Sequence, residues 1–178
     1  MDLEDIIEGC KKQNPKAQKA LYDMFSRKLF GVCLRYCKSR EDAQDVFQEA
    51  FVKVFNSLDK YRGIGSLESW MRKVFINHSL NHYRYDKFLN SVCADDINIA
   101  YEDKELENMI DEYSNKKILE AIQKLPNKQR IIFNMVEVEE MSYEEVSDVL
   151  NISQGCIRAH NFKAKKKLKT LLKEFDKQ

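Results

Sequence analysis

Residues 142–167 read SYEEVSDVLNISQGCIRAHNFKAKKK. Ser142 and Glu145 have the spacing of a capping box, which predicts that a short amphipathic helix begins here. Asn151 follows this helix and tolerates the left-handed backbone of a tight turn, and Ser153 is an N-cap for a long basic helix. A short helix, a tight turn and a long basic helix together predict a helix-turn-helix.

This pattern is typical of DNA binding, because the exposed start of the second helix can enter the major groove. We expect that leading end to expose Gln154, Gly155, Cys156, Arg158 and Ala159. Cations and a histidine further along the helix are placed to meet base edges or phosphates: Arg158, His160, Lys163, Lys165, Lys166 and Lys167. The alternative is a lysine run that only solvates an amphipathic helix.

The rest of the chain also predicts helices. Asn14 followed by Pro15 marks a helix start, and Ser39 and Ser66 cap two further helices. Apolar residues follow these caps at spacings of three and four, most clearly at Ala43, Val46, Phe47, Ala50, Phe51, Val54, Phe55 and Leu58. With only 5 Gly and 2 Pro, a fold built from many tight turns and strands is disfavoured. We therefore predict an all-α protein.

The charges divide the chain into three segments, although the net charge is only +1. Residues 1–90 and residues 113–178 each have a net charge of +4, whereas residues 91–112 carry one Lys and eight Asp or Glu. Two small helical domains, an N-terminal bundle and a C-terminal helix-turn-helix domain, joined by an acidic linker are the simplest interpretation. The linker is either a solvated tether or a segment that also shields a basic surface.

Aromatic, cationic and amide side chains alternate from residue 61 to residue 85. This mixture is suited to single-stranded DNA, because aromatic rings stack on bases, amides read base edges and cations follow the backbone. The members are Tyr61, Arg62, Ser66, Trp70, Lys73, Asn77, Asn81, Tyr83, Arg84 and Tyr85. For Trp70 the alternative of an ordinary core or boundary position is favoured.

Other function classes have little support. No apolar run approaches the roughly 20 residues of a membrane helix, and the acidic start differs from basic targeting peptides, so we expect a cytoplasmic protein. His78 and His82 lack a third metal ligand at motif spacing, and Cys33 and Cys37 are expected to be buried apolar residues. Without a phosphate-binding loop or a nucleophile motif, we expect no catalysis, no metal and no cofactor.

Three stretches taken together resemble one known family. They are residues 40–51 (REDAQDVFQEAF), residues 61–71 (YRGIGSLESWM) with Ile76 and Asn77, and the stretch from Leu125 through residues 141–146 (MSYEEV) to residues 163–165. In this order they are similar to the bacterial sigma factors of RNA polymerase, in particular the small extracytoplasmic-function group. The resemblance covers nearly the whole chain outside the acidic segment.

The resemblance implies a role for each stretch. Asp45, Gln48 and Glu49 would bind core RNA polymerase. The minus-10 promoter element would be held by Tyr61, Arg62, Ser66, Lys73, Asn77, Asn81 and Arg84, and the minus-35 element by Ser153, Gln154, Cys156, Arg158, Ala159, His160, Lys163 and Lys166. The family also implies an anti-sigma protein as a partner, and we expect a monomer when no partner is bound.

The chain departs from the family pattern at several of these positions. Cys156, Ala159 and His160 stand where the family often has a hydroxyl residue, Ser and Arg, so promoter preference cannot be transferred. Two other functions stay open: an autonomous helix-turn-helix regulator whose first domain binds a ligand or dimerises, and a nucleic-acid enzyme. The regulator gives no account of the polar stripe that contains Asp45 and Glu49, and the enzyme would need clustered metal-binding carboxylates.

Overall fold

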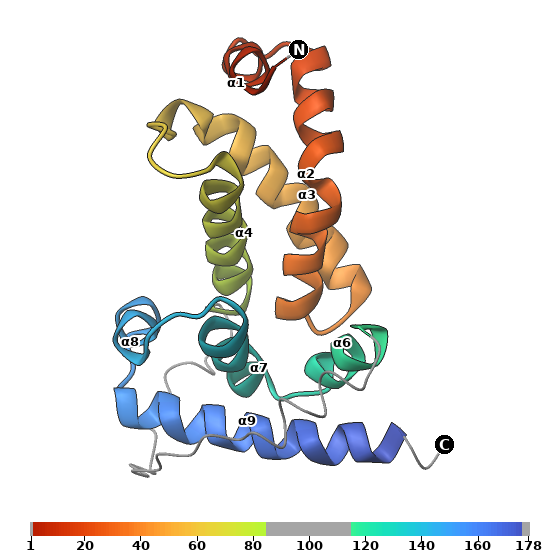
Figure 1. The fold of residues 1–178 in the computed structure, drawn as a ribbon, viewed down its shortest axis with the longest axis vertical. Coiled ribbons are helices and arrows are strands. Elements are labelled where there is room, and N and C mark those ends of the chain that lie inside the picture. Colours follow the sequence, from red (N-terminus) through yellow and green to blue (C-terminus); the bar gives the residue numbers. More distant parts are fainter. Residues whose placement is uncertain (1, 85–114, 176–178) are drawn as a thin grey trace. The chain divides into compact units, whose positions relative to one another are not determined.

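The computed structural model describes residues 2–84 and 115–175. The chain divides into two compact units, residues 1–83 (unit 1) and residues 84–178 (unit 2), and each is described by itself (Figure 1). Every regular element in the described ranges is a helix or a helical turn, so the prediction of an all-α fold is confirmed. The expected acidic linker, residues 91–112, lies outside the described residues.

Unit 1 is a helical bundle. Its elements are α1 (Leu3–Lys11), α2 (Pro15–Tyr36), α3 (Arg40–Ser57), the short turn η1 (Leu58–Lys60) and α4 (Leu67–Arg84). The expected caps are present: the Asn14 side chain accepts a hydrogen bond from the backbone N–H of Lys16 at 2.9 Å, and Ser39 Oγ accepts from the N–H of Asp42 at 3.1 Å. These bonds satisfy donors that the first turn of a helix leaves unpaired.

The core of unit 1 forms around the apolar stripe of α3. Phe47 and Phe51 pack against Phe75 of α4, with ring centroids 5.7 and 5.3 Å apart. Each such buried aromatic side chain contributes about 1.5–3 kcal/mol to folding. At the surface, Lys28 of α2 pairs with Glu68 of α4 at 2.7 Å. Because the stripe faces the core, the opposite face of α3 is left to polar residues.

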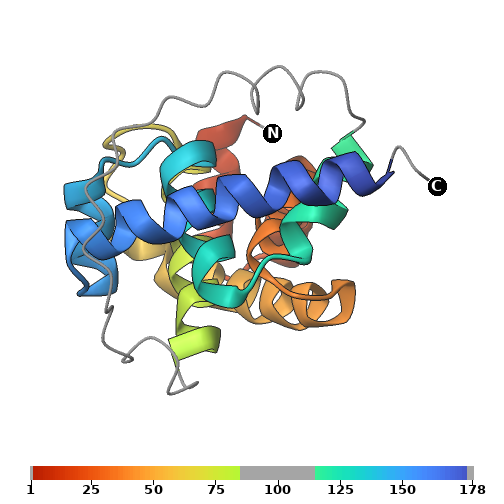
Figure 2. The same ribbon diagram turned by 90° about the horizontal axis from the view of Figure 1, so that it is seen from below.

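Unit 2 is organised along its last helix. Its elements are α6 (Asn115–Gln123), α7 (Asn127–Phe133), the π-helical turn η2 (Asn134–Val138), α8 (Tyr143–Leu150) and α9 (Gln154–Phe175). Helices α6, α7 and α8 all pack on α9, which runs as the long blue helix in Figure 2. The buried cluster between α6, α7 and α9 contains Ala121, Ile122, Leu125, Phe133, Ala164, Leu168 and Leu172.

A buried arginine joins α6 to α7. Arg130 has no exposed surface, and its Nη1 donates to the carbonyls of Leu125 at 3.0 Å and Gln123 at 3.3 Å. Its Nη2 donates to the Asn127 side chain at 2.7 Å. Gln123 is the last residue of α6, whose terminal carbonyls have no intrahelical donor, and Leu125 lies in the connection to α7, so Arg130 supplies donors to both inside the core. The apolar pattern around Arg130 did not predict this role.

Candidate functional site

The predicted helix-turn-helix is confirmed by the geometry of α8 and α9. The N–H of Ser142 donates to the Glu145 carboxylate at 2.8 Å, and the N–H of Glu145 donates to Ser142 Oγ at 3.2 Å, which completes a capping box. Asn151 has φ 55° and ψ 48°, the left-handed conformation expected of the turn. Ser153 Oγ then accepts from the N–H of Cys156 at 3.2 Å and caps α9.

The prediction that Cys156 and Ala159 lie at an exposed end is wrong. Their relative exposures are 1% and 4%, and Ile157 between them is fully buried. The buried face at the start of α9 is therefore wider than the apolar spacing indicated. Side chains this buried do not present their atoms to a DNA base.

The remaining predicted residues, on α9 and at its cap Ser153, are polar and have exposed surface. Ser153, Gln154, Lys163 and Lys166 are exposed, whereas Arg158 and His160 are half-buried. Lys167, on the same stretch of helix, is exposed as well. This surface has the donors and positive charge that base edges and phosphates require.

Arg158 is held in place by two neighbours. Its guanidinium carbon lies 5.2 Å from the ring centroid of Tyr143 on α8, and Nη2 is 3.5 Å from the side-chain oxygen of Gln154. A cation over an aromatic face is attracted by the ring quadrupole, which restricts the arginine to fewer rotamers. Local sequence spacing does not identify this role of Tyr143, because a contact between two helices of a motif has no signature in it.

Lys165 has a structural role rather than a free charge. Its Nζ pairs with Glu137 Oε1 in η2 at 2.7 Å, and the same oxygen accepts a hydrogen bond from Asn161 Nδ2 at 2.6 Å. The expectation that Lys165 adds charge to the basic surface therefore needs correction, since Glu137 offsets it locally. The network instead ties α9 to the turn that precedes α8.

In unit 1, the loop before α4 presents a rigid turn. Gly63 and Gly65 have φ values of +74° and +75°, which other residues rarely adopt. The Tyr61 hydroxyl donates to the Gly65 carbonyl at 2.8 Å, and its ring centroid lies 5.7 Å from that of Trp70. Ile64 at the tip is 85% exposed. The loop is thus fixed by its own hydrogen bond and by an aromatic contact with α4.

The other residues predicted to hold minus-10 DNA surround this loop or follow it along α4. Arg62 and Ser66 are exposed next to the glycines, and Ser66 Oγ accepts from the N–H of Ser69 at 3.1 Å. Lys73, Asn77 and Asn81 are exposed at four-residue spacing, which places them on one face of α4. The side chain of Arg84, the last residue of α4, lies outside the described part of the chain. Trp70 is half-buried, which agrees with the boundary position favoured above.

The residues predicted to bind polymerase lie together on α3. Asp45, Gln48 and Glu49 are all exposed, while Val46 and Phe47 between them and Ala50 after them are buried. Spacings of three and four place the polar side chains on one helix face. Glu49 also contacts His78 of α4, with 2.9 Å between Oε2 and Nε2.

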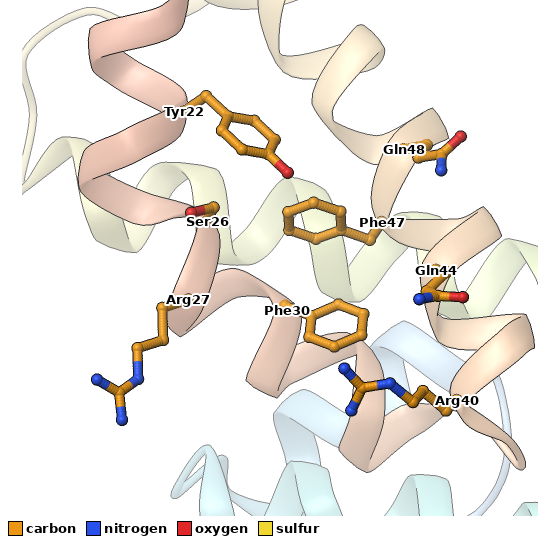
Figure 3. A pocket seen from close by; sticks show the side chains of 8 residues that line it. All are labelled: Tyr22, Ser26, Arg27, Phe30, Arg40, Gln44, Phe47 and Gln48. Atoms are coloured by element: carbon orange, nitrogen blue, oxygen red, sulfur yellow. The ribbon is translucent and has the colours of Figure 1, made fainter.

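An open groove of about 450 Å³ adjoins this face between α2 and α3 (Figure 3). Its aromatic wall includes Phe47, whose ring centroid lies 5.9 Å from that of Tyr22 and 5.4 Å from that of Phe30. The Arg40 guanidinium lies 5.3 Å from the Phe30 centroid. The full lining is Tyr22, Ser26, Arg27, Phe30, Arg40, Gln44, Phe47 and Gln48. Gln48 lines this groove and also belongs to the polar face of α3. Two cationic side chains, Arg27 and Arg40, line the groove as well.

Three findings on the described residues concern a buried thiol, metal ligands and membrane spans. Burial raises the pKa of the Cys33 thiol to about 12, so this cysteine is not a thiolate nucleophile near neutral pH. Across residues 2–84 and 115–175, His, Cys, Asp and Glu side chains form no group of three that could hold a metal ion. No helix in these same ranges is long and apolar enough to cross a membrane.

Two family models match the chain, one in each unit. The model of Sigma-70 region 2 matches residues 21–88, and the model of Sigma-70, region 4 matches residues 115–168. The first range includes the polar face of α3, the glycine loop and α4. The second includes the helix-turn-helix.

Curated relatives match over most of the chain. The chain is 28% identical to the RNA polymerase sigma-H factor of Pseudomonas aeruginosa, with 96% of both chains covered. It is 25% identical to the ECF RNA polymerase sigma-E factor of Escherichia coli, with 90% of this chain and 88% of the relative covered.

Solved structures show the same fold at lower sequence identity. The sigma factor RpoE of Bartonella quintana, solved in complex with the anti-sigma factor NepR, has a TM-score of 0.53 at 18% identity and covers 87% of this chain and 96% of its own. CnrH, solved with the cytosolic domain of CnrY, has a TM-score of 0.50 at 18% identity, with coverages of 95% and 96%.

Proposed function

Because the chain belongs to the sigma-70 family, in its extracytoplasmic-function group, we propose that its exposed surfaces divide the work of promoter-specific initiation. Unit 1 matches Sigma-70 region 2 and unit 2 matches Sigma-70 region 4. Unit 1 binds core RNA polymerase and the opened minus-10 element, and unit 2 binds the minus-35 duplex. This division rests on the order in which three exposed polar surfaces follow one another along the chain: the polar face of α3, the glycine loop with α4, and the start of α9.

Core polymerase docks on the polar face of α3. Asp45, Gln48 and Glu49 project from one side of a helix whose other side is packed in the core, so they are carried on a rigid support. Two carboxylates and an amide suit a partner surface that offers cations and hydrogen-bond donors. The adjoining groove widens the same docking surface through Gln48.

The minus-10 strand is held by the glycine loop and α4. An unpaired base can contact the exposed Ile64 and the half-buried ring of Tyr61, while Lys73, Asn77 and Asn81 follow the strand along α4. Melting of the duplex is favoured because these groups bind single-stranded DNA and not paired DNA.

The minus-35 element is read by the start of α9. Gln154 and Arg158 lie nearest the leading end and contact base edges, whereas Lys163 and Lys166 bind phosphates. His160 is half-buried beside them and contacts the backbone or a base at the edge of the site. Cys156 and Ala159 are left out of this surface because they are buried.

An anti-sigma protein regulates the chain by covering one or more of these surfaces. The Bartonella sigma factor that the chain resembles was solved with such a partner. Without a partner the chain is a monomer. It acts in the cytoplasm, where RNA polymerase is found, and it carries no catalytic site or cofactor of its own.

Co-purification with core polymerase tests the docking surface. We expect the wild-type chain to co-purify, and the double substitution Asp45→Arg with Glu49→Arg to abolish binding because it reverses both charges. The circular dichroism spectrum should be unchanged, since both side chains are exposed. If the folded double variant still co-purified fully, core polymerase would not dock on this face of α3. A chain that binds DNA but never polymerase would instead be an autonomous regulator.

A further inference from the structure

Glu49 and His78 connect two helices at the edge of the docking face. The Nε2–H of His78 on α4 donates to Oε2 of Glu49 on α3, and the two atoms are 2.9 Å apart. The two side chains differ strongly in exposure, 18% for His78 and 65% for Glu49. The imidazole is therefore largely enclosed by protein, while the carboxylate that it contacts is at the surface.

The position of His78 is fixed by the core beneath it. Phe75 lies one turn earlier on α4 and packs against Phe51 of α3, with ring centroids 5.3 Å apart. These aromatic contacts set the distance between the two helices at the level of the histidine. Glu49, by contrast, has three rotatable side-chain bonds and would sample several rotamers if nothing held it.

We propose that His78 is a positioning residue, which holds the Glu49 carboxylate in the conformation that core polymerase binds. This inference rests on the proposed function, because Glu49 matters only if the α3 face docks on polymerase. A carboxylate has two oxygens, so Glu49 can accept from His78 and from a cation of the partner at the same time. Ordering the Glu49 side chain before binding removes part of the entropy cost of association. This saving should lower the Kd for core polymerase by about three- to tenfold.

Substitutions of His78 separate positioning from general stability. His78→Gln retains a side-chain N–H that can donate to Glu49, whereas His78→Leu fills the space without a donor. His82→Leu is a matched control, because His82 is an exposed histidine one turn further along the same helix. Each full-length variant is titrated with core polymerase to obtain a Kd, and its thermal unfolding is followed by circular dichroism.

We expect His78→Leu to weaken polymerase binding by about three- to tenfold, and His78→Gln and His82→Leu to stay within about twofold of the wild type. In a Glu49→Gln background, which weakens the charged hydrogen bond, His78→Leu should cause a clearly smaller further loss. Wild-type affinity in His78→Leu would overturn the proposal. Equal losses in both backgrounds, or no rescue by His78→Gln, would overturn it too.

A second substitution shows which claim has failed. Asp45→Arg acts on the docking face one turn before Glu49, so Asp45→Ala is measured beside it to exclude an ion pair between the new arginine and Glu49. If Asp45→Arg abolishes polymerase binding while His78→Leu leaves it unchanged, only the positioning role is wrong. If both variants bind as tightly as the wild type, the docking surface itself is wrong.

Discussion

At the scale of single residues, Arg158 illustrates how one side chain is prepared for DNA. It is half-buried at the start of α9, 5.2 Å from the Tyr143 ring centroid and 3.5 Å from the Gln154 oxygen. Lys166 lies two turns further along and is exposed. A guanidinium held in a fixed orientation is suited to a specific base, whereas a mobile ammonium is suited to phosphate.

Substituting these two residues should therefore have different effects. Arg158→Ala should cost about 1–3 kcal/mol on a preferred minus-35 duplex and reduce discrimination against other sequences. Lys166→Ala should weaken binding to all DNA sequences alike. It should also reduce the magnitude of the slope of log K against log salt by about one unit. Binding titrations on a preferred and a scrambled duplex at several salt concentrations measure both quantities. If both variants lost the same binding free energy on the preferred and on the scrambled duplex, Arg158 would contact only phosphate.

Gly65 sets the conformation of the loop before α4. A Cβ built on Gly65 meets nothing within 4 Å, so an alanine there is opposed by the φ of +75° and not by crowding. The backbone cost is about 1–2 kcal/mol. We predict that Gly65→Ala lowers the permanganate reactivity of minus-10 thymines in polymerase complexes, while core polymerase binding is unchanged.

Gly65→Asn is the matched variant for this loop. Asparagine enters the left-handed region more readily than alanine does, so it should recover part of the lost reactivity. If alanine and asparagine both behave as glycine does, the loop conformation has no part in holding open DNA.

At the scale of elements, unit 2 depends on how its helices are joined. Arg130 donates to the carbonyl of Gln123 at the end of α6 and to that of Leu125 in the connection to α7. Glu137 binds both Asn161 and Lys165 of α9. The first set of contacts joins α7 to the end of α6, and the second joins η2 to α9, the helix that is proposed to contact DNA.

We predict that Arg130→Met destabilises unit 2 by about 2–4 kcal/mol, because it leaves buried carbonyls without a donor. Lys167→Met at an exposed position should change stability by less than about 0.5 kcal/mol. The single tryptophan, Trp70, belongs to unit 1. Urea unfolding should therefore show an earlier loss of helical circular dichroism in Arg130→Met, with the tryptophan fluorescence midpoint unchanged. An unaltered circular dichroism transition would contradict this role of Arg130.

Local features of the elements could be predicted from sequence, and contacts between them could not. Asn14, Ser39 and Ser142 act as caps as expected, because a cap depends on residues within a few positions. The Glu49–His78 contact spans 29 residues and the Glu137–Asn161 contact spans 24, so no local pattern signals them. The burial of Cys156 and Ala159 could not be predicted for the same reason, because the burial of a side chain depends on parts of the chain that are distant in sequence.

Helix α1 (Leu3–Lys11) was also not predicted. At the acidic start of the chain, Asp2 accepts a hydrogen bond from the N–H of Asp5 at 2.8 Å and caps this helix. Ile6 and Cys10 of this helix are buried. Their four-residue spacing is the signal that could have identified α1.

At the scale of the whole molecule, charge is distributed unevenly along the chain. The acidic segment 91–112 separates two segments that are each basic by four charges. An anionic segment tethered to cationic surfaces has a high effective concentration near them and competes with DNA phosphates. Exposed ion pairs are individually weak, so this competition has to be collective and sensitive to salt.

We therefore predict that neutralising six carboxylates of this segment raises DNA binding by the free protein at low salt. The substitutions change Asp95, Asp96, Glu102, Asp103, Glu105 and Glu107 to the corresponding amides. The difference from the wild type should close near 0.5 M salt, where the screening length is about 4–5 Å. Equal binding by both proteins at every salt concentration would leave the segment as a tether only.

Run-off transcription with purified core polymerase tests the central claim most directly. The template carries promoter sequences selected from a random library by the polymerase and this chain together. We predict that transcripts start at one position, that they require added protein, and that Asp45→Arg with Glu49→Arg removes them. Initiation at the same position and rate without the protein, or binding to the template with no transcript, would contradict the account.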